Sequence, residues 1–168
     1  MDYVIKDAVR DMANQISAVW LSGWHDGHDG ITPPALVALR TAQSFYDRTL
    51  DNLSITRVAL CGSDVFGFYM VHQDELYQMY VDRRARGTGL AQALIKDAET
   101  RIQSAGHRVA WLACAIGNEP ARRFYEKSGW VNAGRHTLDM DTAQGPFPLD
   151  VWKFEKTLSL SIPDPSDP

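Results

Sequence analysis

The chain of 168 residues has a mass of 18.8 kDa, which is the size of one domain. Apolar residues make up 45% and charged residues 23%, and these globular averages exclude collagen-like and wholly disordered chains. Seventeen basic and 21 acidic side chains leave a net charge of −4, which argues against a nucleic-acid-binding protein.

The chain shows no sign of membrane insertion or secretion. The longest apolar run, Val109–Ile116, is far shorter than the ~18–20 residues of a membrane helix, and Met1–Lys6 opens no signal peptide. Cys61 and Cys114 lack metal or redox spacing and are predicted to be reduced core thiols. The sequence therefore predicts a cytoplasmic protein with one domain over residues 1–160 and a frayed, proline-rich tail over 161–168.

The first half of the chain opens with a strand and two helices and continues with three strands. Two glycines in His25–Thr32 are expected to end the first helix. Gly62-Ser63-Asp64 has hairpin composition. In the third of these strands, alternation predicts Tyr77 and Met79 on one face. The predicted elements are strand Tyr3–Ala8, helix Val9–Trp24, a helix from Pro33-Pro34 to Leu50, and strands Ser54–Cys61, Val65–His72 and Glu75–Val81.

The second half alternates strands with helices. Apolar residues recur every four positions in the helix before Gly106, which is placed to end it. The predicted elements are helix Leu90–Ser104, strand Val109–Ile116, helix Glu119–Ser128 and strands Trp130–Leu138 and Asp150–Leu158. The order β-α-α-β-β-β-α-β-α-β-β indicates a mixed α/β sheet covered by helices.

A basic, glycine-bearing turn leads from the strand ending at Val81 into the helix starting at Leu90. Its main-chain N–H groups and the helix N-terminus together favour an anion, and Arg83, Arg84 and Arg86 add positive charge. A dinucleotide fingerprint fails because Gln92 stands where the third glycine is needed, and no Walker A loop exists. The alternative is an exposed turn whose arginines serve solubility.

A second motif accompanies this turn, and the two together resemble the GNAT superfamily of acyl-CoA-dependent N-acyltransferases. Arg84–Gly89 fits the R/Q-x-x-G-x-G/A pattern of that family in full. Asn118 and Phe124-Tyr125-Glu126-Lys127 fit its N…FYEKxG pattern, with Trp130 in place of the usual phenylalanine. The resemblance implies a mainly antiparallel sheet of six or seven strands with helices on both faces.

The resemblance also implies that acetyl-CoA is the co-substrate and indicates where it binds. Its pantetheine arm would lie where the Glu75–Val81 strand separates from the next one, and its pyrophosphate would lie on the N–H groups of the turn. Asn118 would contact the arm, although the same residue could be an ordinary helix N-cap. The cofactor-binding residues implied are Met79, Tyr80, Val81, Arg84, Arg86, Gly87, Thr88, Gly89, Leu90, Asn118 and Tyr125.

Two residues are candidates for the chemistry. Tyr125 would act as general acid, giving a proton to the departing thiolate, and its alternative is a core tyrosine. Glu75 matches the place where many members of the family carry a general base, and its alternative is a solvated carboxylate at a strand end. Neither cysteine has a histidine at recognisable spacing, so direct attack in a ternary complex is expected.

The acceptor pocket is expected around the first helix and the loop after it. Trp20, Trp24, His25 and Asp26 combine aromatic rings with an acid, which suits a cationic amine. His25 and His28 also raise the question of a metal, but no third ligand is in view and none is predicted.

The prediction is transfer of an acetyl group from acetyl-CoA to a primary amine, and the rival is a non-catalytic acyl-CoA sensor. The acceptor could be a small amine, an amino acid, a drug or a protein amino group. No membrane or nucleic-acid partner is expected. The sequence leaves open whether the chain forms a homodimer.

Overall fold

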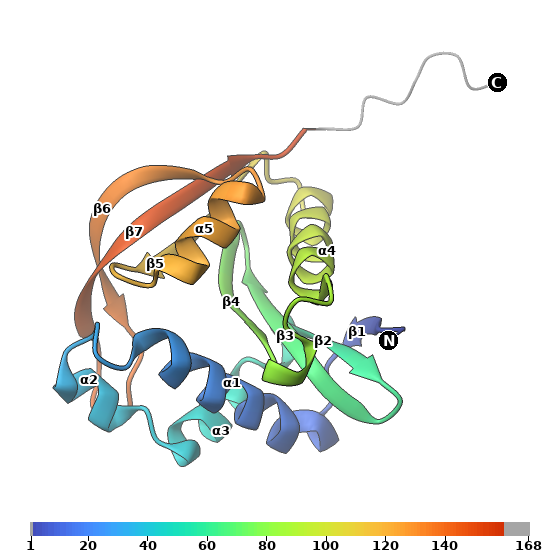
Figure 1. The fold of residues 1–168 in the computed structure, drawn as a ribbon, viewed down its shortest axis with the longest axis horizontal. Coiled ribbons are helices and arrows are strands. Elements are labelled where there is room, and N and C mark those ends of the chain that lie inside the picture. The colour runs from blue at the N-terminus through green and yellow to red at the C-terminus, as the bar shows by residue number, and fades with distance from the viewer. Residues whose placement is uncertain (1, 160–168) are drawn as a thin grey trace.

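A computed structural model describes residues 2–159, so the tail predicted over 161–168 lies outside the described residues. One sheet of seven strands runs in the order β1-β2-β3-β4-β5-β7-β6 (Figure 1). All neighbouring strands are antiparallel except β4 and β5. The strand ends agree with the sequence prediction within three residues. The strands are β1 Val4–Asp7, β2 Thr56–Cys61, β3 Asp64–His72, β4 Glu75–Val81, β5 Val109–Ala115, β6 Val131–Met140 and β7 Phe147–Thr157.

Helices cover both faces of the sheet, as predicted, and each face has its own core (Figure 1). The core under α4 contains Leu94, Ile102 and Phe154, and α5 packs at its margin. The core under the N-terminal helices contains Trp20, Phe45 and Phe68. The helices are α1 Ala13–His28, α2 Pro34–Leu39, α3 Ala42–Asp51, α4 Leu90–Ser104 and α5 Glu119–Lys127.

The first helix does not end at Trp24 as predicted but continues to His28. Of the two glycines predicted to end it, Gly30 lies beyond the helix with a φ of +82°, whereas Gly27 lies inside it, and Gly23 and Gly27 are close-packing positions. A Cβ on Gly23 would lie 2.5 Å from Cδ1 of Tyr80, and one on Gly27 would lie 2.8 Å from Nδ2 of Asn118. The glycines thus let α1 approach β4 and the start of α5.

The single helix predicted from Pro33-Pro34 to Leu50 is two helices, because the chain bends at Arg40. The backbone of Arg40 leaves helical geometry with ψ of 64°, and Thr41 then caps α3 by accepting a hydrogen bond from the Ser44 N–H at 3.2 Å. Tertiary contacts hold the bend, since the Arg40 carbonyl accepts from His25 Nε2 at 2.9 Å.

The predicted alternation of β4 is wrong at Tyr77, where a β-bulge interrupts the pairing with β3. Met70 pairs with Gln78 but Val71 pairs with Leu76, so Tyr77 has no partner of its own. Leu76 and Met79 consequently pack into the core under α4, whereas Tyr77 packs into the other core. A bulge of this kind leaves no trace in a period-2 pattern.

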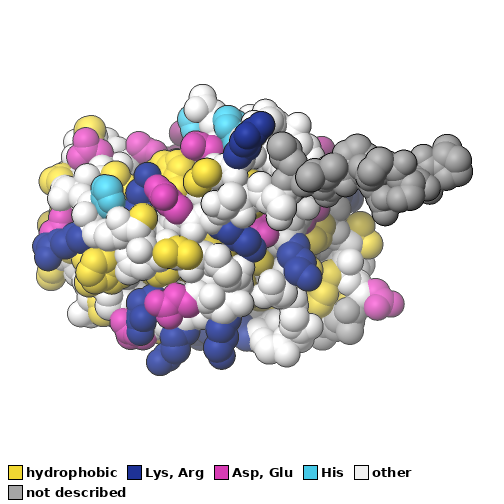
Figure 2. All heavy atoms as spheres, turned by 90° about the horizontal axis from the view of Figure 1, so that it is seen from above, with side chains coloured by type: hydrophobic (Ala, Val, Ile, Leu, Met, Phe, Trp, Pro, Cys, Tyr) yellow, Lys and Arg dark blue, Asp and Glu magenta, His cyan; other side chains and the backbone are white. Residues whose placement is uncertain are grey.

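The face shown in Figure 2 carries acidic and basic side chains interspersed with each other, without a large field of one sign. This mixture agrees with the small net charge of −4. Among the described residues, no helix combines the length and the apolar character that crossing a bilayer requires.

The two helical glycines are expected to respond oppositely to alanine. In Gly23→Ala the new methyl meets the buried face of Tyr80, and such overpacking should lower the free energy of unfolding by about 1–3 kcal/mol. In Gly27→Ala the obstacle is only the Nδ2 end of the flexible Asn118 side chain, which can shift slightly while its Oδ1 keeps its hydrogen bond, so the higher helix propensity of alanine should leave stability equal or raised by about 0.5–1 kcal/mol. Urea unfolding of both variants measures the contrast, and equal effects would contradict it.

Candidate active site

β4 and β5 separate almost as soon as they meet. Glu75 and Trp111 form their one registered pair, supported by the Trp111 N–H donating to the Asp74 carbonyl at 3.0 Å. Beyond this pair a cavity of about 750 Å³ opens between the two strands, α1 and α5. Its lining includes Trp24, Glu75, Met79, Cys114, Asn118 and Tyr125.

The edge of β4 that faces this cavity carries main-chain groups without a strand partner. Asp82 donates to the Phe66 carbonyl at 2.8 Å, and bonded pairs alternate along antiparallel strands. Tyr80 therefore directs its main-chain groups at β3, whereas Met79 and Val81 direct theirs at the open edge. Of the three residues expected to bind the pantetheine through their backbone, two are oriented for it.

Tyr80 contributes its side chain instead, on the face covered by α1. Its ring lies against Phe68 and Trp20, with centroids 5.8 and 6.5 Å apart respectively. Trp20 itself is fully buried and does not line the cavity, so its predicted contact with substrate is wrong. In the sequence, Trp20 lies at helical spacing from other apolar residues of the first helix, which indicates a core position.

The turn predicted to bind pyrophosphate keeps several main-chain N–H groups free. Gly87 and Gly89 have φ of +76° and +87°, a region that favours glycine, and no atom stands within 4 Å of where a Cβ would lie. The N–H groups of Gly87, Gly89 and Leu90 donate to no acceptor among residues 2–159. Those of Arg86 and Thr88 already donate to the Arg83 and Ala85 carbonyls, at 3.3 and 3.4 Å.

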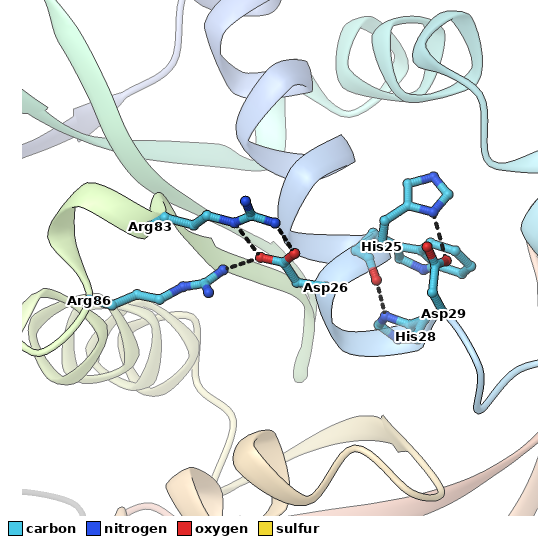
Figure 3. Close-up of polar contacts among 7 residues, drawn as sticks. His25, Asp26, His28, Asp29, Arg83 and Arg86 are labelled. Atoms are coloured by element: carbon cyan, nitrogen blue, oxygen red, sulfur yellow. Dashed lines mark hydrogen bonds and ion pairs between the residues drawn. The ribbon is translucent and has the colours of Figure 1, made fainter.

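The arginines of the turn are held by carboxylates. Figure 3 shows Asp26 of α1 pointing at Arg83 and Arg86, which donate to its Oδ2 at 2.8 and 2.7 Å. These two guanidinium groups hold the pKa of Asp26 well below its usual range. Asp26 therefore fastens α1 to the turn, and although it lines the cavity, its carboxylate already pairs with two cations of the protein itself.

Arg84 has a similar internal partner and points elsewhere. Its Nε and Nη2 donate to the Asp82 carboxylate at 3.0 and 3.1 Å, and its guanidinium lies 4.5 Å from the centre of the Phe66 ring. It does not line the main cavity but a smaller hollow beside α1. The structure thus positions Arg84 to shape the turn.

Asn118 combines the two roles that the sequence left open. Its Oδ1 accepts a hydrogen bond from the Ala121 N–H at 3.3 Å, which caps α5. The side chain also lines the cavity and contacts α1 at Gly27. A helix cap is thus part of the cavity wall.

Tyr125 lies half-buried on α5 and lines the cavity. Its ring packs on Phe124 and Phe154, with centroids 5.5 and 5.9 Å away. Its hydroxyl forms no hydrogen bond with the described residues, and burial, with smaller contributions from Cys114 and Tyr80, raises its pKa. The group is therefore a phenol that keeps its proton at neutral pH.

Glu75 stands where β4 and β5 part, with its side chain at the cavity. Burial, together with the neighbouring Asp74 and Asp141, raises its pKa to about 7. A carboxyl group with this pKa exchanges a proton near neutral pH, which suits a general base better than a fully solvated carboxylate would.

Cys114, predicted as a core thiol, is buried at the cavity wall on β5. Burial, with a smaller contribution from Glu119, raises the pKa of its thiol to about 12. Because the thiolate is the nucleophilic form, this cysteine is poorly suited to covalent catalysis.

The two histidines of α1 serve its C-terminal end. His25 does not line the cavity; its Nδ1 contacts the Asp29 carboxylate at 2.7 Å (Figure 3). Burial opposes a charge on His25, but the Asp29 contact and the Arg40 carbonyl raise its pKa overall. His28 lines the cavity, stacks on Trp24 at 4.5 Å, and has its pKa lowered by burial. Within the described part of the chain, no three metal-ligating side chains come together.

Four residues that no sequence motif indicated lie at the wall formed by β4, α3 and the ends of α2 and β6. Arg48 Nη2 donates to the Tyr77 hydroxyl at 3.0 Å, and that hydroxyl donates to Asp141 Oδ2 at 3.0 Å. Arg40 Nη1 donates to the Asp141 carbonyl at 2.6 Å. All four line the cavity. No motif joins residues so far apart, although arginines among apolar helix positions were a signal.

A family model described as the acetyltransferase (GNAT) family matches residues 31–130, more than half of the chain. The chain belongs to the GNAT family. Mycothiol acetyltransferase from Corynebacterium glutamicum is 29% identical over 120 residues, which are 68% of this chain and 39% of that protein. The chain thus spans about two fifths of the length of this curated relative.

Solved structures share the GNAT fold over nearly the whole chain. A GCN5-related N-acetyltransferase from Rhodopseudomonas palustris has a TM-score of 0.73 and 17% identity, covering 94% of this chain and 97% of its own. PaiA N-acetyltransferase from Thermoplasma acidophilum, solved in complex with coenzyme A, has a TM-score of 0.65 and 18% identity, covering 94% and 99%. At these identities the likeness establishes the fold.

The raised pKa of Glu75 in this GNAT protein predicts a pH-dependent stability. The unfolded chain releases the Glu75 proton near the ordinary pKa of 4.5, whereas the folded protein retains it up to about 7. The free energy of unfolding should therefore fall as the pH rises through this window. Glu75→Gln cannot release this proton and should not show this pH-dependent fall in the free energy of unfolding. Between about pH 4 and pH 8, wild type should therefore lose stability relative to the variant. Denaturant midpoints of both proteins test this, and a pH-independent difference would refute it.

Proposed function

We propose that the protein transfers an acetyl group from acetyl-CoA to a primary amine by direct attack in a ternary complex. The observation that carries the proposal is a single cavity shared by an open strand edge, a phenol and a carboxyl group with a pKa near 7. Family membership supports acetyl transfer as the reaction class.

The fit to acetyl-CoA follows from the hydrogen-bonding groups on offer. A pantetheine arm contains amides, and the main-chain groups of Met79 and Val81 at the open edge of β4 can pair with them as a neighbouring strand would. A pyrophosphate needs several N–H donors at a positive site, and Gly87, Gly89 and Leu90 supply free donors at the N-terminus of α4. Asn118 closes the opposite wall of the cavity.

The chemistry then requires one base and one acid. Glu75 accepts a proton from the acceptor's ammonium, directly or through a water molecule, which frees the nitrogen lone pair. That nitrogen bonds to the thioester carbonyl carbon as the carbon–sulfur bond breaks, and its excess proton passes, directly or through water, to the phenolate that Tyr125 becomes when it protonates the sulfur. Glu75 then releases its own proton to solvent. The phenol of Tyr125 protonates the departing sulfur, giving the amide and CoA. Positioning both reactants in one cavity supplies much of the rate enhancement.

CoA should raise the melting temperature of the wild-type protein, since a ligand that binds only the folded state stabilises it. Gly89→Val should abolish the shift, because a branched side chain at φ of +87° strains the turn and crowds its free N–H groups. Gly62→Val is the matched control, because Gly62 also has a positive φ of +62° and open surroundings but lies in the turn between β2 and β3, not in the turn before α4. Equal CoA shifts in the two variants would displace the proposed pyrophosphate site.

Tyr125→Phe separates an enzyme from a non-catalytic acyl-CoA sensor. The variant keeps the packing on Phe124 and Phe154 but loses the transferable proton, so turnover should fall about 10²-fold or more. Affinity for CoA should stay within a few-fold. Turnover is measured by thiol release on a panel of amines.

Two further variants control this experiment. Tyr46→Phe removes a phenol from α3 that does not line the cavity and should change nothing. Tyr80→Phe tests another phenol that lines the cavity, and a loss confined to this variant would reassign the acid to Tyr80. Binding of CoA without turnover on any amine would favour the sensor.

A further inference from the structure

The aromatic groups that the sequence offered to a cationic acceptor are already in contact with cations of the protein itself. The Arg48 guanidinium lies 4.3 Å from the centre of the Trp20 ring, and that of Arg40 lies 5.9 Å from the centre of the Trp24 ring. Both arginines line the cavity. This end of the cavity is therefore itself positively charged and does not offer a binding site for a cation.

Neither guanidinium has an anionic partner among residues 2–159. Arg40 is only 4% exposed, yet it donates to a main-chain carbonyl, that of Asp141, and its Nε has no partner. Arg48 donates to the neutral hydroxyl of Tyr77, and its Nε and Nη1 are shielded from solvent without a partner. The Asp141 carboxylate accepts from Tyr77 instead of from either arginine.

A buried charge at Arg40 and a half-buried like charge at Arg48, without a counter-ion, are costly to maintain. Burial, together with the nearby Arg48, lowers the pKa of Arg40 to about 10, which still leaves it charged at neutral pH. Buried charges in proteins are normally paired or fully hydrogen-bonded. The third arginine that lines the cavity, Arg86, has the Asp26 carboxylate as partner. Among the arginines lining the cavity, the unpaired state is therefore specific to Arg40 and Arg48.

We propose that Arg40 and Arg48 form a subsite for an anionic group, a carboxylate or a phosphate, on the amine acceptor. A guanidinium matches both groups through paired N–H donors. The anion would supply the missing opposite charge and orient the amine at the end of the cavity where Glu75 lies. This inference rests on the proposed acetyl transfer and narrows the acceptor to amines that also carry a negative charge.

The subsite is separate from the place assigned to the cofactor phosphates. Those phosphates have the free N–H groups of the turn after β4, at the N-terminus of α4. Arg40 follows α2 and Arg48 lies on α3, on the opposite face of the sheet from α4. An anion at the arginine pair is thus additional to CoA.

The experiment compares acceptors that differ only in the anionic group. Thiol release is measured with a panel of amino acids, with their carboxamides, and with aminoalkyl phosphates beside the corresponding amino alcohols. The expected result is a kcat/KM at least about 10²-fold higher for an anionic acceptor than for its neutral counterpart, because the neutral one leaves the guanidinium groups unpaired. The carboxylate and phosphate arms identify which anion fits.

Arg40→Gln should remove most of this preference. Its kcat/KM for the neutral acceptors should stay within about 3-fold of wild type, and its CoA-induced shift in melting temperature should stay within a few degrees. Arg40→Lys, which keeps the charge but not the planar fork, should retain part of the preference, and it replaces Arg40→Gln if that variant does not fold. Arg10→Gln is the control, since Arg10 is exposed and does not line the cavity.

A second readout does not depend on turnover. N-acetyl amino acids, which carry the carboxylate of a product, should raise the melting temperature of wild type in the presence of CoA, and their carboxamides should not. Neutral acceptors that react as well as anionic ones, or a preference unchanged in Arg40→Gln, would overturn the subsite but leave acetyl transfer standing. If the N-acetyl amino acids and their carboxamides gave equal shifts or none, the subsite would also be overturned. If CoA alone did not raise the melting temperature of wild type, that would count against the proposed function.

Discussion

The separation of β4 from β5 is the constraint on which the rest of the site depends. One registered pair, Glu75 with Trp111, joins the two strands before they diverge. Strands that stayed paired would consume the outward main-chain groups of Met79 and Val81 and would leave no cavity. Divergence instead turns one strand edge inside the domain into an unpaired hydrogen-bonding surface, which a ligand containing amides can complete.

The separation is tolerated because helices from both halves of the chain close around it. α1 reaches β4 at Gly23 and the start of α5 at Gly27, and both contacts are possible because glycine has no side chain. Asp26 on the same helix holds Arg83 and Arg86. One face of α1 therefore joins the strand, the phosphate turn and the second motif, so the binding groups are positioned before any ligand arrives.

Charge is distributed unevenly around the cavity, and this unevenness carries functional information. The arginines nearest the turn are neutralised by Asp26 and Asp82, which leaves main-chain N–H groups as the main donors for the phosphates that we propose bind there. Arg40 and Arg48 at the acceptor end have no such partners among the described residues. The arginines of the basic sequence motif are thus less free to bind an anion than Arg40 and Arg48, which belong to no motif.

The sequence by itself determined the order of the elements apart from the division between α2 and α3, nearly all strand boundaries and the turn at Gly87–Gly89, because these depend on local periodicity and short motifs. Only the tertiary structure decided what Gly27 and Asp26 do. A glycine in a close helix contact has the same sequence signature as a helix breaker, and a carboxylate that pairs with arginines of a distant turn has the same signature as one that is free. Asp26 pairs with Arg86, whereas Arg40 and Arg48 have no carboxylate partner in the part of the chain that the structure describes. Both facts depend on segments that are distant in the sequence and come together only when the chain folds.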